Sequence, residues 1–158
     1  MSPSLRSIPS VTVPPPSSGL ERVYVALGSN VGDRAAHLAY ARERLGALPG
    51  TRLAGASRVE ETAPLGPVPQ GPYFNQMVLL ETTLTPAALL AACRAIEAER
   101  GRERRERWGP RTLDLDIVCY GARMVREPGL TIPHPELPRR AFWLREIAEL
   151  EALAVTHG

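Results

Sequence analysis

Residues 22–48, RVYVALGSNVGDRAAHLAYARERLGAL, contain a strand, a turn and a helix in direct succession. The run VYVAL is short and wholly apolar, which is typical of a buried strand, and Gly28 follows it. The glycines of GSNVG permit a tight turn, and Asp33 can accept hydrogen bonds from the free amides of a helix that follows. Apolar residues then recur every three or four positions, so we expect a helix over 34–48.

The rest of the chain continues this alternation of strands and helices. Apolar and period-two runs predict strands, and periods of three to four residues predict helices. We also expect a short strand near Met124 and Val125 to pair back with the strand before it. The other predicted elements are an irregular or edge strand at 52–61, a loop at 62–72, strands at 73–82 and 112–120, and helices at 85–101 and 138–150.

The length and the connections indicate one α+β domain. A chain of 158 residues has the size of a single ordinary domain. Residues 1–20 are rich in Pro and Ser, so we expect a disordered tail there and a single domain over 21–158. Because the connections suit antiparallel neighbours, we expect a ferredoxin-like sandwich, with helices packed on a mainly antiparallel sheet.

Composition limits the classes of partner. A net charge of +2 is too small to indicate a nucleic-acid partner by itself. No apolar run is long enough to span a membrane, and residues 1–20 lack the pattern of a secretory signal. Cys93 and Cys119 lie outside any metal-binding spacing, which favours free thiols. We therefore expect a cytoplasmic protein that binds neither membrane nor nucleic acid.

Two carboxylates stand in the middle of an apolar strand, in Leu113-Asp-Leu-Asp-Ile117. Side chains alternate along a strand, so Asp114 and Asp116 share one face, with Cα atoms about 6.7 Å apart. Two charges at that range repel by roughly 2 to 3 kcal/mol at an effective dielectric constant near 20. The pair fits either the solvated acidic face of an edge strand or a magnesium site completed by water and phosphates.

An arginine-rich segment directly precedes this strand. Residues 100–111, RGRERRERWGPR, hold six arginines, and Gly101 and Gly109-Pro110 interrupt any helix there. The segment fits either a solvated helix face with Glu pairs or a mobile loop that brings cations beside the two carboxylates. The second interpretation indicates a polyphosphate ligand. His134, between two prolines, fits either a phosphate contact or a structural role.

Five motifs together resemble the 6-hydroxymethyl-7,8-dihydropterin pyrophosphokinase family of folate synthesis. They occur in the family's order and extend over most of residues 23–142. The arginine segment is one residue shorter than the family's, which leaves the register of Arg104, Arg105 and Arg107 open, and the ending FWLREIAEL lacks a few residues. The motifs are ALGSNVGDR at 26–34, TAPLGP at 62–67, YFNQMV at 73–78, RWGPRTLDLDI at 107–117 and TIPHPELPRRAF at 131–142.

The resemblance implies transfer of the diphosphate of ATP to the hydroxymethyl group of 6-hydroxymethyl-7,8-dihydropterin, with release of AMP. It implies that Asp114 and Asp116 hold two Mg²⁺ ions and that Arg102 and Arg111 stabilise the transition state. The implied pterin contacts are Thr62, Leu65, Tyr73, Asn75 and Phe142, with the rings of Tyr73 and Phe142 enclosing the pterin. The implied ATP contacts are Glu97, Trp108, Arg111, Ile117, His134 and Arg140.

Two other functions fit parts of the sequence. One is an arginine-rich nucleic-acid-binding domain, in which residues 100–111 bind a phosphate backbone and Asp114 is dispensable. The other is a non-catalytic relative that binds pterin or nucleotide without turnover, against which the presence of Asp114, Asp116 and Arg111 speaks. We expect a monomer or a weak homodimer.

Overall fold

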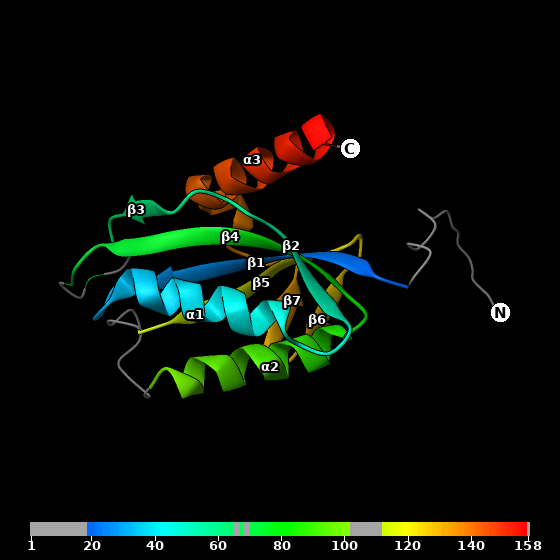
Figure 1. The fold of residues 1–158 in the computed structure, drawn as a ribbon, viewed down its shortest axis with the longest axis horizontal. Helices are drawn as coiled ribbons and strands as arrows, with labels where there is room; N and C mark the ends of the chain where they lie inside the picture. Colours follow the sequence, from blue (N-terminus) through cyan, green and yellow to red (C-terminus); the bar gives the residue numbers. More distant parts are fainter. Residues whose placement is uncertain (1–18, 65–66, 68–69, 102–111, 158) are drawn as a thin grey trace.

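The structure is a computed structural model that describes residues 19–64, 67, 70–101 and 112–157, so residues 1–18 of the tail expected at 1–20 lie outside them. Three helices and a 3-10 turn accompany the strands (Figure 1). The elements are β1 (Glu21–Ser29), α1 (Arg34–Gly46), β2 (Thr51–Ala56), β3 (Glu60–Thr62), β4 (Tyr73–Thr82), α2 (Pro86–Glu99), β5 (Asp114–Tyr120), β6 (Val125–Glu127), β7 (Leu130–Ile132), a 3-10 turn (Leu137–Arg139) and α3 (Ala141–His157).

The main sheet is antiparallel, with the strand order β2-β4-β1-β5, and β3 also pairs with β4. Strand β1 therefore lies between β4 and β5, although both follow it in sequence by more than 40 residues. The two helical connections, through α1 and α2, lie on one side of the sheet and α3 lies on the other (Figure 1). This confirms the expected ferredoxin-like α+β sandwich.

The two sides of the sheet explain why VYVAL is apolar throughout. Val23, Val25 and Leu27 belong to the core beneath α1 and α2, whereas Tyr24 and Ala26 belong to a second core beneath α3. Successive side chains of a strand point to opposite faces, so a strand covered on both faces must be apolar at every position. Strand β1 is thus buried by helices on both sides.

The helix starts follow the sequence closely. The Asp33 carboxylate accepts a hydrogen bond from the Ala36 amide at 3.0 Å, and the Thr85 hydroxyl accepts one from the Ala88 amide at 3.1 Å. Pro86 lies in the first turn of α2, where its missing amide costs nothing. In both cases a side-chain oxygen satisfies an amide that the helix itself leaves free.

The expected pairing near Met124 and Val125 is wrong. Strand β6 pairs with β7, not with β5, because Pro128 and Gly129 form the two-residue turn between paired Glu127 and Leu130. Gly129 has φ +78°, the value that the third position of a type II turn requires, with proline before it. The Pro-Gly turn, and not a turn at Gly121, therefore sets the partner of β6.

The final helix is longer than the sequence indicates, and it buries an acid. Trp143, Glu146 and Leu150 form its buried stripe against the sheet. Neither carboxylate oxygen of Glu146 has a hydrogen-bond partner in the described part of the chain.

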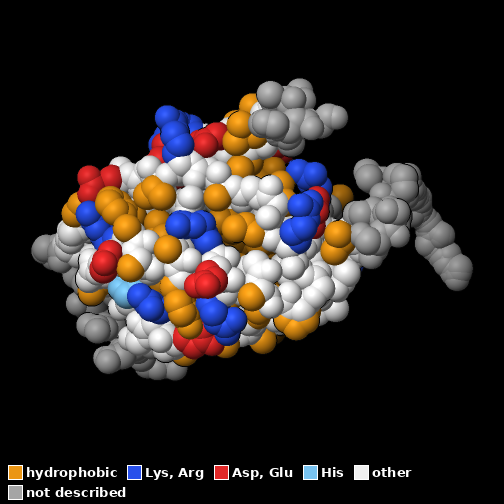
Figure 2. All heavy atoms as spheres, viewed as in Figure 1, with side chains coloured by type: hydrophobic (Ala, Val, Ile, Leu, Met, Phe, Trp, Pro, Cys, Tyr) orange, Lys and Arg blue, Asp and Glu red, His pale blue; other side chains and the backbone are white. Residues whose placement is uncertain are grey.

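No helix within the described ranges is long and apolar enough to cross a membrane. On the face drawn in Figure 2, arginine and acidic side chains lie interspersed over the surface.

Candidate active site

Two rows of paired residues across the sheet bring the acidic residues of β5 close to the side-chain amide of Asn75 on β4. In the first row Gly28 of β1 pairs with Asn75 on one side and with Asp114 on the other. In the next row Ala26 pairs with Met77 and with Asp116. Residues directly opposite in an antiparallel sheet point to the same face. Asn75, Asp114 and Asp116 therefore share the α3 side, with only small residues on the strand between them.

Gly28 keeps the space between these groups open. A Cβ atom at this position would lie 3.4 Å from Asn75 Oδ1 and 3.5 Å from Cδ1 of Tyr73. Neighbouring strands are about 4.8 Å apart, so Asn75 and Asp114 are separated by about 10 Å across β1. This is room for two ligands to meet above a strand that carries no bulky side chain.

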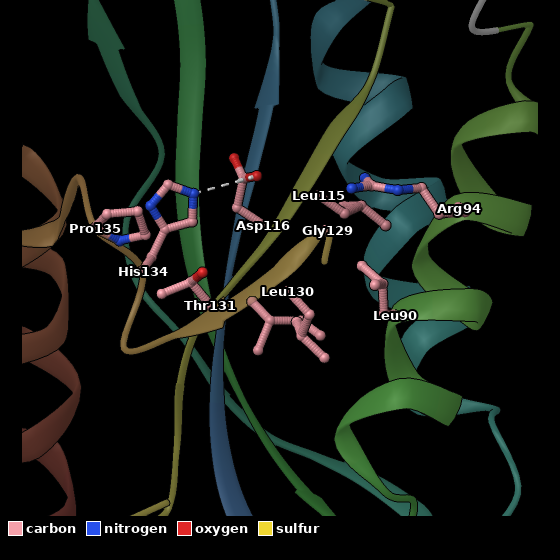
Figure 3. Close-up of a pocket in the computed structure, with 10 residues that line it drawn as sticks. Leu90, Arg94, Leu115, Asp116, Gly129, Leu130, Thr131, His134 and Pro135 are labelled. Carbon is pink, nitrogen blue, oxygen red and sulfur yellow. Dashed lines mark ion pairs between the residues drawn. The ribbon is translucent and has the colours of Figure 1, made fainter. Parts of the chain in front are cut away.

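His134 faces the acidic strand. Its Nε2 lies 3.8 Å from Asp116 Oδ1 (Figure 3). Its backbone amide donates to the Val118 carbonyl at 2.9 Å. The Glu136 amide donates to Nδ1 at 3.0 Å, which leaves the ring proton on Nε2, toward Asp116. Burial lowers the pKa of His134 and the charge of Arg140 lowers it further, while Asp116 raises it, so the neutral ring is favoured.

A pocket of about 230 Å³ opens beside Asp116 (Figure 3). Its walls come from three separate segments: α2, β5 and the chain from Gly129, in the turn between β6 and β7, to Pro135. Its apolar and polar groups are mixed, as in sites for small organic ligands. The lining residues are Leu90 and Arg94 of α2, Leu115, Asp116 and Ile117 of β5, and Gly129, Leu130, Thr131, His134 and Pro135.

Glu97 fixes the acidic strand against α2. Its side chain is buried, and its Oε2 accepts a hydrogen bond from the Leu115 amide at 2.7 Å. Arg94 Nη1 lies 3.3 Å from the other oxygen of the same carboxylate. Since Leu115 lies between Asp114 and Asp116, Glu97 holds the backbone that carries both acids. Arg94 links this carboxylate to the pocket.

The predicted pterin contacts gather at the other side of β1. Thr62 pairs directly with Tyr73, and Asn75 Nδ2 donates to Thr62 Oγ1 at 2.5 Å. Tyr73 and Asn75 share the α3 face of β4 with Met77. Phe142, at the start of α3, packs against the same core, and its ring meets Trp143 edge-on at 6.3 Å. These four predicted residues thus lie on one face.

Arg140 directly precedes α3, and its guanidinium group can bind an anion. Its guanidinium carbon lies 4.6 Å from the centre of the Trp143 ring. Its Nε is buried without a hydrogen-bond partner among the described residues. A buried donor without an acceptor is costly, so a ligand oxygen would stabilise it.

Most of the described site residues form two groups on either side of β1, and Phe142 and Arg140 lie at the start of α3. One group is Asp114, Asp116, Ile117, His134 and Glu97, and the other is Thr62, Tyr73 and Asn75. Four predicted residues, Leu65, Arg102, Trp108 and Arg111, lie outside the described residues. Sequence reasoning missed Leu90 and Arg94, although their i, i+4 spacing places both on one helix face. It also missed Thr131, which lies two positions before the first proline of the PHP motif.

The acids suit a hard divalent cation. Among the described residues no group of three or more His, Cys, Asp or Glu side chains is placed to hold a metal. Magnesium does not need one, because it keeps several waters and takes one or two carboxylates plus substrate phosphates. Asp116 is 38% exposed, so its carboxylate is open to such ligands. The residues present therefore fit magnesium bound together with a polyphosphate.

Comparison with known proteins assigns the family. Residues 24–152 match the family described as 7,8-dihydro-6-hydroxymethylpterin-pyrophosphokinase (HPPK). The chain is 44% identical over 139 residues to the 2-amino-4-hydroxy-6-hydroxymethyldihydropteridine pyrophosphokinase of Methylorubrum extorquens, covering 88% of each chain. It is 44% identical over 131 residues to the enzyme of that name from Pseudomonas aeruginosa, covering 83% of this chain and 81% of the relative. The chain therefore belongs to the HPPK family, the ATP-using enzymes that pyrophosphorylate a hydroxymethyl pterin in folate synthesis.

Proposed function

We propose that the two groups of residues flanking β1 are the two substrate sites of this pyrophosphokinase, with ATP beside β5 and the pterin beside β4. The observation that carries the proposal is the row Asn75, Gly28, Asp114, in which one bare glycine separates the pterin side from the acidic side. A direct transfer needs the hydroxymethyl oxygen and the phosphorus held close and aligned. The row supplies such a spacing on rigid, hydrogen-bonded strands.

On the acidic side we assign Asp114 and Asp116 as ligands of two Mg²⁺ ions. When bound there, magnesium neutralises phosphate charge and lowers the barrier to phosphoryl transfer. Glu97 keeps the carboxylates at a fixed spacing by holding the Leu115 amide. His134 donates from Nε2 toward the same region and stays uncharged, so it can hold a phosphate oxygen without competing for the cation.

The pocket beside Asp116 is the assigned site of the adenosine part of ATP. Leu90, Ile117 and Leu130 offer apolar surface to a flat base, and the pocket leads directly to Asp116. Arg140, with its unpartnered Nε, is assigned to the phosphates. Arg102, Arg111 and Trp108 are assigned to phosphate binding and closure on the sequence resemblance alone.

On the β4 side the pterin is assigned between the rings of Tyr73 and Phe142. Flat aromatic rings give a flat heterocycle a large contact area. Asn75 Nδ2 is committed to Thr62, so the amide oxygen is the group left to accept from the pterin edge. The peptide groups near Thr62 and Leu65 complete the polar contacts.

The test of the proposed function is the identity of the nucleotide product. Purified protein is incubated with ATP, MgCl₂ and 6-hydroxymethyl-7,8-dihydropterin, and the nucleotides are separated. AMP that forms only when both pterin and Mg²⁺ are present is the expected result, and EDTA should stop it. ADP would mean a monophosphoryl kinase. Absence of any product from folded protein that still binds pterin would favour the non-catalytic relative.

Replacing Asn75 by alanine should weaken pterin binding by about 1 to 3 kcal/mol, roughly 5- to 150-fold in Kd. The side chain is buried, so its loss leaves both Thr62 and the pterin edge without a partner. Fluorescence titration of the pterin measures the change, and the KM for ATP is the internal control. An unchanged Kd would place the pterin elsewhere.

We further propose that the enzyme works in the cytoplasm as a monomer or weak homodimer. Both cysteines, Cys93 and Cys119, are free thiols, as expected in a reducing compartment. Sedimentation at micromolar protein concentration tests the oligomeric state.

A further inference from the structure

Arg34, the first residue of α1, contacts three separate parts of the β3 and β4 region. Its Nη1 donates to Glu61 Oε2 at 3.0 Å and to the Pro72 carbonyl at 2.9 Å. Its guanidinium carbon lies 3.7 Å from the centre of the Phe74 ring, which is a close cation–π contact. One planar group therefore joins β3, the chain before β4 and β4 itself.

The partners of Arg34 are sequence neighbours of the residues assigned to bind the pterin. Glu61 immediately precedes Thr62, and Pro72 immediately precedes Tyr73. Phe74 lies between Tyr73 and Asn75, and its ring packs with the core on the opposite face of the sheet. Arg34 thus holds the residue next to each of the assigned pterin contacts on β3 and β4. It also joins the two ends of the segment 62–72, which leaves β3 and returns to β4.

Arg34 is held by the combination of an ion pair, a hydrogen bond to a carbonyl and a cation–π contact. Glu61 is 53% exposed, and an ion pair at such a surface contributes little alone. Arg34 is only 26% exposed, and the carbonyl and the aromatic ring fix the plane of its guanidinium. Lysine has no planar, multi-donor group and cannot reproduce all three contacts. The Asp33 cap fixes the start of α1, so Arg34 is held by a rigid element.

A neighbouring side chain makes the same connection. Asn30, in the turn before α1, donates through Nδ2 to Gln70 Oε1 at 2.6 Å and to the Gly71 carbonyl at 3.1 Å. The β1–α1 turn is therefore attached to the end of the segment 62–72 by two residues four positions apart. Arg34 adds the attachment to the beginning of that segment, through Glu61.

We propose that Arg34 is a positioning residue of the pterin site, which sets the spacing between Thr62 on β3 and Tyr73 and Asn75 on β4. The inference rests on the pterin assignment of the proposed function. Arg34 acts through Glu61, Pro72 and Phe74 and touches no substrate. Its effect should fall on the pterin, because its partners Glu61, Pro72 and Phe74 are not among the residues that line the pocket beside Asp116.

The experiment compares Arg34→Gln, Arg34→Lys and Glu61→Gln with Arg44→Gln as matched control. Arg44 lies on the same helix and makes a two-fold contact with Glu99, at 2.9 and 2.8 Å, away from the pterin residues. Arg34→Gln should raise the KM and Kd for the pterin by about 10-fold, with the KM for ATP within twofold. Arg34→Lys should give pterin KM and Kd values between those of the original protein and Arg34→Gln. Arg44→Gln should leave the KM values for pterin and ATP unchanged.

The outcomes separate a positioning role from a structural one. An unchanged pterin KM in Arg34→Gln, or equal rises for pterin and ATP, would overturn the inference. If Arg34→Gln fails to fold, Arg34→Lys and Glu61→Gln decide, because each removes only part of the contact. Asn75→Ala separates failure of the Arg34 inference from failure of the pterin assignment. If Asn75→Ala weakens pterin binding and Arg34→Gln does not, only the Arg34 inference fails. If neither variant changes pterin binding, the pterin assignment itself fails.

Discussion

Replacing Asp116 by asparagine should lower the rate of diphosphoryl transfer by about a thousandfold or more, with little change in stability. Asparagine keeps the size of the side chain but removes the charge that holds a divalent cation. The carboxylate is 38% exposed and stands on the same face of β5 as Asp114, so its neutralisation also relieves a repulsion. Turnover at saturating ATP and pterin measures the effect, and thermal unfolding measures stability.

The chain provides its own control for this change. Asp33 is the one aspartate outside β5, and it caps α1 through the Ala36 amide. Asparagine is as good a cap as aspartate, so Asp33→Asn should retain both activity and stability. Normal turnover in Asp116→Asn would exclude Asp116 as a metal ligand. A loss shared equally by Asp33→Asn would show that the assay reports damage to the fold.

Replacing Glu146 by glutamine should stabilise the protein at pH 8 by up to about 5 kcal/mol. Burial raises the pKa of the Glu146 carboxyl from its ordinary 4.5 to about 9, and the nearby Glu60 carboxylate adds to the shift. Between these pH values the folded protein keeps a proton that the unfolded chain releases. Stability from this group therefore falls as pH rises from 4.5 toward 9. Glutamine resembles the protonated acid and does not titrate.

The pH dependence is the decisive measurement for Glu146. Urea unfolding of both proteins from pH 4 to pH 9 should show a gain that is near zero at pH 4 and grows with pH. Glu149→Gln is the control: it is the same change one turn away, at a carboxylate that accepts from the Arg58 amide at 2.9 Å. It should not stabilise. A gain for Glu146→Gln that is independent of pH would contradict the buried acid.

Most of the architecture could be predicted from local patterns. The apolar run of β1, the caps Asp33 and Thr85 and the alternation in β5 each depend on neighbours within a few residues, which is what a sequence displays. The pairing of β6 with β7 was also within reach, because Pro128-Gly129 is a turn signal. The expected pairing with the strand before it rested instead on the turn residue Gly121, which directly follows β5.

The site was only partly predictable, for a different reason. Asp114, Asp116 and His134 stand out by residue type and setting, and the structure places His134 against Asp116. Arg34 and Glu146 do not stand out, because their roles depend on partners 27 to 86 residues away that only the folded chain brings near. The bond from Asn75 to Thr62 is of the same kind. Contacts of this sort follow from sheet register and helix docking.

The row that joins Asn75, Gly28 and Asp114 also limits how the distance between the substrates can vary during evolution. Both assigned sites are attached to β1 by backbone hydrogen bonds. A strand that shifts by one residue turns all its side chains to the other face, so only shifts of two residues, about 6.8 Å, keep the acids and the amide together. A change of that size would separate the reacting atoms. Relatives can therefore change the distance between their bound substrates through the surrounding loops, while the spacing of residues within the sheet stays fixed.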